Sequence, residues 1–378
     1  MKKLLYIVSF LIICIVTSCN KSHYSFDVKE IDYVNQSDTM IDGTMLDFEL
    51  PLGVYNFTLC DSFFIFLTED PSGQLLVYSK EWSFLGSYCS KGRAKNEIIS
   101  PSFLSRQVFI DEGGTVSIPL IEQRARIKVI DVTQSIKMQR TIVSNQRDCN
   151  SIYYLLLDDD INSTLEFFTP TYDRYYADVI ETPYFEIKRM GSEKGKRIEL
   201  YPKVMNLEDM MDATYFYMGG LYKHPTRNMV IQPLYYMDYI IFLDIDNKKY
   251  FGIHQTGSLS FDDRITAVQD VETEDDYYLL HEGKVLDYHY KDVFCSDSFF
   301  MVLYCAGDYS LNVEDPSLSK PELLLFDWEG NLLRSMKLAK RINSIIYDAN
   351  TSTLYGLDRN EGHLYSFDLA DVIANLNY

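Results

Sequence analysis

Short apolar runs separated by clusters of turn-forming residues occupy most of this chain, and the pattern repeats. Leu75 to Leu85 aligns without a gap with Leu323 to Leu333. Each segment reads as a buried strand, a turn and a second strand. Two upstream matches keep the same order: Asp61-Ser62-Phe63-Phe64 with Asp297-Ser298-Phe299-Phe300, and Glu69-Asp70-Pro71-Ser72 with Glu314-Asp315-Pro316-Ser317. Three matches in one order indicate a repeated structural unit.

The same hairpin pattern recurs in four further places, which makes six copies. The additional copies are Ile127 to Asp131, Tyr184 to Lys188, Ile240 to Asp244 and Leu364 to Asp368. The residues at which the first strand of each hairpin meets its turn are Ser79, Asp131, Lys188, Asp244, Asp327 and Asp368, spaced by 52, 57, 56, 83 and 41 residues. Asp is favoured here because its carboxylate accepts a hydrogen bond from the backbone two residues on.

Periods of about 50 residues with about four strands per unit are typical of a β-propeller. We therefore predict an all-β fold, a six-bladed β-propeller with four-stranded antiparallel blades. A solenoid is less favoured because its edge strands would stay exposed. The last unit has three clear strands, so we expect an N-terminal segment, Asp27 to Val34 or Met45 to Leu50, to close the ring. The long spacing before Asp327 predicts loops at Asp270 to Asp276 and at Ala306 to Pro321.

The N-terminus carries a charged start, the apolar run Leu4 to Val16, and then Thr17-Ser18-Cys19. This order is typical of a signal peptide, and the run is shorter than the about 20 residues that a membrane span requires. The sequence around Cys19 resembles the lipobox of bacterial lipoproteins. That resemblance implies cleavage after Ser18, with Cys19 as the lipid anchor to a membrane.

We therefore divide the chain into a signal peptide over residues 1–18, a lipidated tether and possible ring-closing strand over residues 19–45, and the propeller over residues 46–378. Asn20 stands where many lipoproteins of the inner membrane have Asp, and no acidic cluster follows Cys19. We expect a cell-envelope location at the outer membrane, facing the periplasm. The inner membrane and the other leaflet remain open.

Composition narrows the list of partners. The formal net charge of -20 makes nucleic acid an unfavourable partner, and the 30 Tyr and 22 Phe favour strands. After removal of Cys14 and acylation of Cys19, an odd number of cysteines remains: Cys60, Cys89, Cys149, Cys295 and Cys305. We interpret these five as small buried apolar residues rather than disulfide partners.

The lipobox, the six hairpins and the closing block Leu323 to Leu369 together resemble the six-bladed, TolB-like β-propeller lipoproteins of gut-type Gram-negative bacteria, over nearly the whole mature chain. Members often carry a glycine-rich stretch with Pro and Glu after the first blade. Lys91-Gly92-Arg93 and Glu97 fit this stretch, whereas Ala94 and Lys95 stand where Gly and Pro are expected. The resemblance implies the fold and leaves the activity open, because propellers host unrelated functions.

No motif in the sequence predicts catalytic residues, a metal site or a cofactor. The six histidines lack metal-ligand spacing, and neither a Gly-x-Ser-x-Gly elbow nor a phosphate-binding glycine loop is present. Asp158-Asp159-Asp160-Ile161-Asn162 has the oxygens of a calcium site but is better explained as an acidic turn between two strands. Asp244-Ile245-Asp246-Asn247 resembles the start of a calcium loop but lacks the later Gly and Glu, so we interpret it as a turn.

One loop gathers aromatic, cationic and hydrogen-bonding groups: Tyr222-Lys223-His224-Pro225-Thr226-Arg227 joins two predicted strands of the fourth unit. Loops at propeller ends often contact ligands. We therefore name Tyr222, His224 and Arg227 as candidate ligand-binding residues. Blade packing is the competing interpretation for tyrosines in a β-rich chain.

Three functions remain open at this point. The first is a non-enzymatic binding scaffold for a protein or a glycan. The second is an envelope lyase or hydrolase that uses loop residues at the central channel, which convergence of Asp, His, Arg or Tyr at one channel end would favour. The third is a subunit of a membrane-associated envelope complex.

Overall fold

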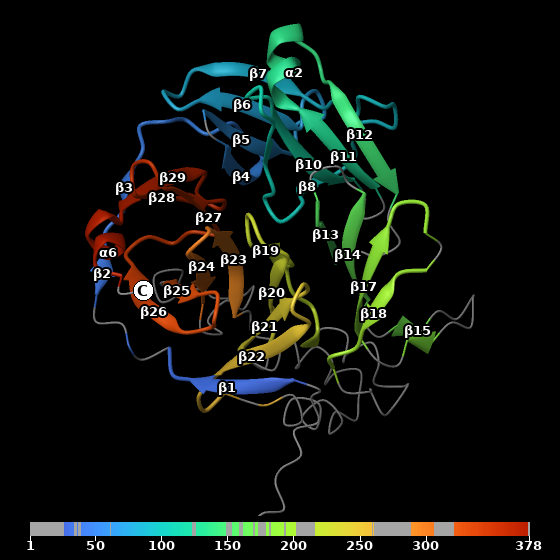
Figure 1. Cartoon of the computed structure of the whole chain (residues 1–378). Coiled ribbons are helices and arrows are strands. Elements are labelled where there is room, and N and C mark those ends of the chain that lie inside the picture. Colours follow the sequence, from blue (N-terminus) through green and yellow to red (C-terminus); the bar gives the residue numbers. More distant parts are fainter. Residues whose placement is uncertain are drawn as a thin grey trace, which may run out of the picture.

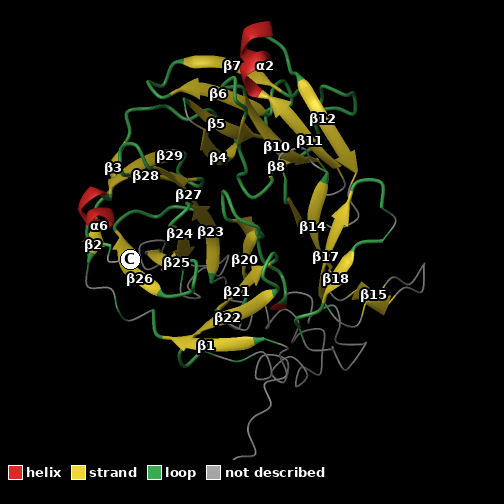
Figure 2. Ribbon diagram, in the orientation of Figure 1, coloured by secondary structure: helices red, strands yellow, loops and turns green. Residues whose placement is uncertain are grey.

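The computed structural model shows six small antiparallel sheets arranged in a ring (Figure 1), so the predicted six-bladed β-propeller is confirmed. Strands and loops make up nearly all of the described chain, and helices are few and short (Figure 2). The structure describes residues 26–33, 36, 39–60, 62–122, 126–148, 153–158, 162–168, 171–172, 179–180, 183–192, 194–201, 216–258, 260, 289–305 and 321–376.

Each blade runs from an inner strand at the channel to an outer strand at the rim. Blade 1 comprises β4 (Val54–Cys60), β5 (Phe63–Thr68), β6 (Leu75–Ser79) and β7 (Phe84–Tyr88). Blade 2 comprises β8 (Pro101–Phe103), β9 (Phe109–Ile110), β10 (Val116–Glu122), β11 (Arg126–Asp131) and β12 (Val143–Asp148). Blade 3 comprises β13 (Tyr153–Leu156), β14 (Ser163–Phe168), β17 (Tyr184–Arg189) and β18 (Lys196–Ile198). Blade 4 comprises β19 (Tyr222–Lys223), β20 (Met229–Pro233), β21 (Tyr239–Asp244) and β22 (Lys249–Gln255). Blade 5 comprises β23 (Tyr290–Cys295), β24 (Phe299–Tyr304), β25 (Glu322–Asp327) and β26 (Leu332–Leu338). Blade 6 comprises β27 (Ser344–Asp348), β28 (Thr353–Asp358), β29 (His363–Asp368) and β3 (Thr44–Met45). The remaining elements are β1 (Asp27–Ile31), β2 (Met40–Ile41), the separate pair β15 (Thr171–Tyr172) and β16 (Val179–Ile180), and the helices α2 (Val132–Met138) and α6 (Ala370–Ala374).

The six hairpin anchors all fall at the end of the third strand of a blade. Five of them are the last residue of that strand, and Lys188 is the last but one of β17. The Asp side chains cap the turns as expected: Asp327 Oδ1 accepts from the backbone N–H of Glu329 at 2.9 Å and of Asn331 at 2.8 Å. Asp131 instead caps α2, accepting from the N–H of Gln134 at 2.8 Å.

An outer strap, residues 26–33 and 39–46, passes along blades 4, 5 and 6 in turn. Strand β1 pairs in parallel with β22 of blade 4, and β2 pairs in parallel with β26 of blade 5. Strand β3 then pairs antiparallel with β29 and supplies the fourth strand of blade 6. Of the two ring-closing segments that the sequence offered, Asp27 to Val34 instead contributes Asp27–Ile31 as a fifth strand of blade 4. The other, Met45 to Leu50, overlaps the observed ring-closing strand Thr44–Met45 only at Met45.

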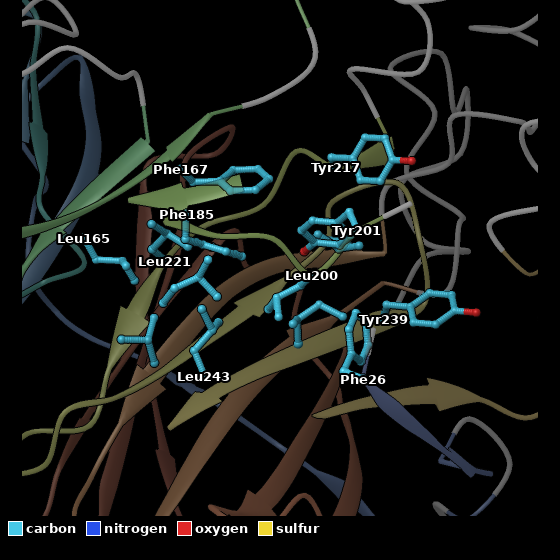
Figure 3. Packing of buried hydrophobic residues seen from close by; sticks show 14 of the residues in the cluster. Phe26, Leu165, Phe167, Phe185, Leu200, Tyr201, Tyr217, Leu221, Tyr239 and Leu243 are labelled. Atoms are coloured by element: carbon cyan, nitrogen blue, oxygen red, sulfur yellow. The ribbon is translucent and has the colours of Figure 1, made fainter. Parts of the chain in front are cut away.

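The hydrophobic core lies mainly between neighbouring blades. The cluster between blades 3 and 4 contains Phe167, Phe185, Tyr201, Leu221 and Leu243, and Figure 3 shows these side chains converging between the two sheets. Phe26 of the outer strap joins the same cluster and meets the Tyr201 ring edge-on, with ring centroids 6.4 Å apart. The strap is therefore attached by packing as well as by backbone pairing.

Several predictions fall outside the described residues, namely those on Cys19, Cys149, the segment Asp270 to Asp276 and residues 306–320. Within the described ranges, no helix is both long and apolar enough to cross a bilayer. The described cysteines Cys60, Cys89, Cys295 and Cys305 form no disulfide; Cys60, Cys89 and Cys305 are buried as expected, whereas Cys295 is only partly buried. Burial raises the pKa of Cys89 to about 12, so this thiol is not activated.

Candidate functional site

The central channel is lined by the inner strand of each blade, and the inner strand of blade 2 is interrupted. Strand β8 pairs with one half of β10 and β9 with the other half. Between them, residues 104–108 leave the sheet, and we call them the channel plug. Pro119 of β10 lies at the gap, where its carbonyl accepts from Leu104 N–H at 3.3 Å. Because Pro has no N–H to donate on that side, the ladder cannot continue there.

The backbone of the plug is held in an unusual conformation. Ser105 and Arg106 both have positive φ, at 48° and 54°. Non-glycine residues in this region cost on the order of 1–3 kcal/mol each and persist where surrounding contacts determine them. Two such residues in sequence therefore direct attention to the contacts that the plug makes.

The plug contacts the inner region of every other blade. Ser105 Oγ donates to the Leu221 carbonyl of blade 4, and the amide of Gln107 exchanges two hydrogen bonds with the backbone of Leu156 of blade 3, at 2.8 and 3.0 Å. Arg106 Nη2 donates to Asp292 of blade 5, to Ser344 of blade 6, and to Asn56 of blade 1 at 3.2 Å. A loop of blade 2 thus ties together the five other blades at the axis.

Arg106 and Asp292 form a buried ion pair, with side chains only 7% and 9% exposed. Burial raises the pKa of Asp292, while Arg106 and the N–H groups of Ile345 at 2.6 Å and Val293 at 2.9 Å oppose that rise. The second terminal nitrogen of Arg106, Nη1, is buried and has no hydrogen-bond partner among the described residues. A buried donor without a partner is uncommon in native structures, where buried polar groups nearly always have one.

The plug divides the channel into two cavities, each of about 240 Å³. The upper cavity is lined by residues of four inner strands, by one residue of β10 and by nearby loops: Asn56, Phe103, Ser105, Arg106, Ile121, Gly220, Leu221, Tyr222, Tyr235, Lys291 and Asp292. The lower cavity is lined by later residues, among them Thr58, His224, Val293 and Cys295, and by Ser105 to Phe109 of the plug region. Ser105 and Arg106 are common to both cavities and form the partition between them.

Lys291 is the most perturbed cation of the upper cavity. The register of β23 shifts between Tyr290 and Asp292, so Lys291 sits at a bulge, a device that redirects a side chain. Burial above all, with smaller contributions from Arg341 and Arg359, lowers the pKa of Lys291 to about 7, whereas Cys305 and Asp358 oppose the shift. Its amine is therefore about half neutral near pH 7.

The structure separates the three residues of the candidate binding loop. Tyr222 lines the upper cavity, next to Gly220, where an added Cβ would lie 2.5 Å from the tyrosine ring. His224 lines the lower cavity, and Arg227 is not among the residues that line either cavity. The loop does join β19 to β20 as predicted.

His224 shapes its own loop. Its Nδ1 accepts from the backbone N–H groups of Thr226 at 3.1 Å and Arg227 at 3.2 Å, and its ring packs on Trp328 with centroids 4.6 Å apart. Its Nε2 lies 3.0 Å from the Asp297 carbonyl, and the Nε of Arg227 is 2.8 Å from the same nitrogen. Burial and then Arg227 lower the pKa of His224, so the ring is neutral at pH 7.

Two other sequence interpretations can be placed. Asp158 lies between β13 and β14, where its Oδ1 accepts from Asn162 N–H at 2.9 Å, as expected for a turn. Asp244 caps the turn to β22 by accepting from Asn247 N–H at 3.0 Å. Within the described part of the chain, no group of three or more His, Cys, Asp or Glu is placed to hold a metal ion.

Sequence reasoning missed Arg106, Lys291 and Asp292. The available signal was Pro119, since a proline inside the central strand Val116–Glu122 indicates a break in the neighbouring strand. Nothing in the local sequence showed that the displaced residues would enter the channel.

Comparisons with known proteins establish the fold and no more. No family model matches the chain, and no curated protein matches it. Among solved structures, a protein from Bacteroides fragilis NCTC 9343 described as exported has a TM-score of 0.51 at 12% identity, covering 91% of this chain and 99% of its own. A member of the DUF4221 family from Bacteroides vulgatus has a TM-score of 0.50 at 10% identity, covering 87% of this chain and 97% of its own. At such identities the likeness concerns architecture, and in architecture this chain is similar to both.

Proposed function

We propose that this protein is a lipid-anchored binding propeller of the cell envelope that receives a glycan or peptide group in its upper cavity. The observation that carries the proposal is the channel plug, which turns an open channel into a closed-ended cavity. Tyr222, Tyr235 and Lys291 line that cavity and offer aromatic faces and a hydrogen-bonding amine. Ligand sites of this kind are concave, with a few placed polar groups.

Export and lipidation are part of the same proposal. The lipobox around Cys19 supports an anchor, and the resemblance to TolB-like propeller lipoproteins supports a bacterial envelope location, at the outer membrane facing the periplasm. The description of the Bacteroides fragilis protein as exported is in keeping with this. Several acyl chains at about 0.8 kcal/mol per buried CH₂ would hold the protein at the bilayer.

The anchor can be tested by metabolic labelling with a palmitate analogue in cells that carry the full chain. We expect label on the wild type in the membrane fraction, and neither label nor membrane retention for Cys19→Ser. Cys14→Ser is the matched control, because it lies in the segment removed by cleavage. A labelled Cys19→Ser protein would contradict the anchor.

The binding role can be tested on glycan and peptide arrays. We expect a ligand that binds the wild type and loses at least tenfold in affinity with Tyr222→Ala. Arg227→Ala should leave binding unchanged, because Arg227 lines neither cavity. An array without any hit, or a hit insensitive to every upper-cavity substitution, would overturn the proposal.

An envelope lyase or hydrolase is the second candidate, and Lys291 is the observation in its favour. A general base works best with a pKa near the operating pH, and Lys291 has a pKa of about 7. It shares the upper cavity with Tyr222 and the Arg106–Asp292 pair. Cleavage of an array ligand on incubation, abolished by Lys291→Met, would favour the enzyme over the binding propeller.

A further inference from the structure

The upper cavity is surrounded mainly by positive charge, although the whole molecule is negatively charged. The chain has a formal net charge of -20, yet Lys291 and Arg106 line this cavity, and Arg341 and Arg359 lie close enough to perturb Lys291. The acidic groups that face them are Asp292 and Asp358. Because Asp292 is paired with Arg106, Asp358 faces Arg341, Arg359 and Lys291, and the surroundings of Lys291 carry an excess of positive charge.

A second, independent observation is the buried and unpartnered donor of Arg106, a residue that lines this cavity. The Nη2 of Arg106 donates hydrogen bonds to three acceptors, whereas Nη1 has no hydrogen-bond partner among the described residues. A side chain that is 7% exposed and carries an unsatisfied charged donor is a costly arrangement. Because Nη1 itself is buried, a small shift of the guanidinium towards an incoming oxyanion, or towards a water that bridges to it, would satisfy this donor.

The cavity also limits the size of its occupant. Ligand pockets are commonly about 300–1,000 Å³, so a cavity of about 240 Å³ admits one small group rather than a length of polymer. Tyr222 and Tyr235 lie on its wall, and aromatic faces pack well against sugar rings.

We propose that the upper cavity binds the anionic group of an acidic sugar, with Lys291 facing the oxyanion, Arg106 beneath it, and Tyr222 and Tyr235 beside the ring. This inference rests on the proposed binding function and names the class of ligand that the cavity takes. The ligand neutralises the positive charge that Arg341 and Arg359 add to the surroundings of Lys291.

The proposal requires binding to be linked to protonation. An anion beside Lys291 favours the ammonium form and raises its pKa above the value of about 7 in the free protein. Affinity is then constant below pH 7 and falls as pH rises, because the free protein must take up a proton to bind. One proton predicts a loss of about 10- to 30-fold in affinity between pH 6.5 and pH 8.5.

The test is calorimetry on the full-length protein in detergent, with D-glucuronate as probe. D-glucose serves as the neutral matched ring and sodium sulfate as the anion without a sugar. We expect glucuronate to bind at pH 6.5 with little proton uptake, to bind more weakly at pH 8.5 with the uptake of about one proton, and to outcompete glucose at least tenfold. Lys291→Met should abolish both the preference and the pH dependence, while Lys137→Met, an exposed lysine on α2, should change neither.

Each alternative outcome is distinct. Glucose binding as tightly as glucuronate would overturn the anionic ligand and leave the binding propeller in place. Lys291-dependent binding of sulfate without glucuronate would overturn the acidic sugar. Absence of binding by all three probes would overturn the inference, and the array experiment then decides the proposed function separately.

A labelling measurement guards against a variant that fails to fold. The neutral amine of Lys291 in the wild-type protein should be acetylated rapidly at pH 7.5, and glucuronate, unlike glucose, should slow that reaction several-fold. Mass spectrometry of the Lys291 peptide provides the rate. Labelling that glucuronate leaves unchanged would contradict the proposal without any mutation.

Discussion

The Arg106 side chain links the channel plug to blades 1, 5 and 6 at the centre of the molecule. Taking two charges out of water is expensive, and removing one partner of a buried pair typically costs about 3–5 kcal/mol because the other charge is left uncompensated. Here the loss would extend to the hydrogen bonds with Ser344 and Asn56. The pair therefore holds the plug in place rather than adding net stability by itself.

We predict that Arg106→Leu lowers the free energy of unfolding by about 3–5 kcal/mol at pH 7. Asp292 already has a raised pKa in the folded state. Without Arg106 its pKa rises further, so the folded state takes up a proton and the deficit shrinks as pH falls towards 5. Urea unfolding followed by tryptophan fluorescence measures both effects. The double variant Arg106→Leu/Asp292→Asn should recover part of the loss, and a deficit below about 1 kcal/mol would contradict the role of the pair.

Replacing Lys291 should have the opposite effect on stability to replacing Arg106, because burial of the Lys291 amine opposes folding. Its pKa is about 7 in the folded protein against 10.5 for an ordinary lysine. Between these values the unfolded chain binds the extra proton, so this group makes the protein more stable as pH rises from 7 to 10.5 and contributes a constant penalty below 7. We predict that Lys291→Met stabilises the fold by about 2–4 kcal/mol at pH 7 and that this gain fades by pH 10. Thermal unfolding over that range tests the prediction, and a gain independent of pH would contradict it.

Among the elements, the outer strap is the one whose attachment is easiest to weaken selectively. Phe26 is 5% exposed in the core between blades 3 and 4, and its ring lies against Gly252 of β22, where an added Cβ would be 3.0 Å away. Glycine at position 252 thus makes room for the strap. Truncating Phe26 leaves a cavity under β1 while the six blades keep their own ladders.

We predict that Phe26→Ala releases β1 and speeds amide hydrogen exchange in β22 at least tenfold, with no change in β5. In a core that cannot rearrange, such a truncation lowers the free energy of unfolding by about 3–5 kcal/mol. Local release of the strap keeps the loss in the free energy of global unfolding below this value. Met40→Ala on β2 is the control, since that side chain is 55% exposed. Unchanged exchange in β22 would show that the strap is held by backbone pairing alone.

For the whole molecule, the sequence predicts the parts whose signal repeats and misses those that occur once. The third strands of all six blades were located because Leu75–Ser79 and its five counterparts share an apolar pattern and a turn residue. The ring-closing β3 and strap strand β2 are two residues long and carry no periodic signal, so only their general location could be anticipated. The plug required spatial knowledge, because Arg106 and Asp292 lie on different blades.

The outer strap also constrains the order in which the molecule can be completed. Residues 27–45 are synthesised early, but β1 pairs with Phe251 and its neighbours, and Met45 pairs with Tyr365 near the end of the chain. Such distant pairings form slowly, because the intervening loop must close before the contacts stabilise it. Until β29 is present, blade 6 has an open edge and the first strands lack their partners, which is a state prone to wrong pairing. The ring of blades therefore closes late, when β3 pairs with β29. Any truncation before residue 363 removes β29, so β3 and blade 6 are left without their strand partners and the ring stays open.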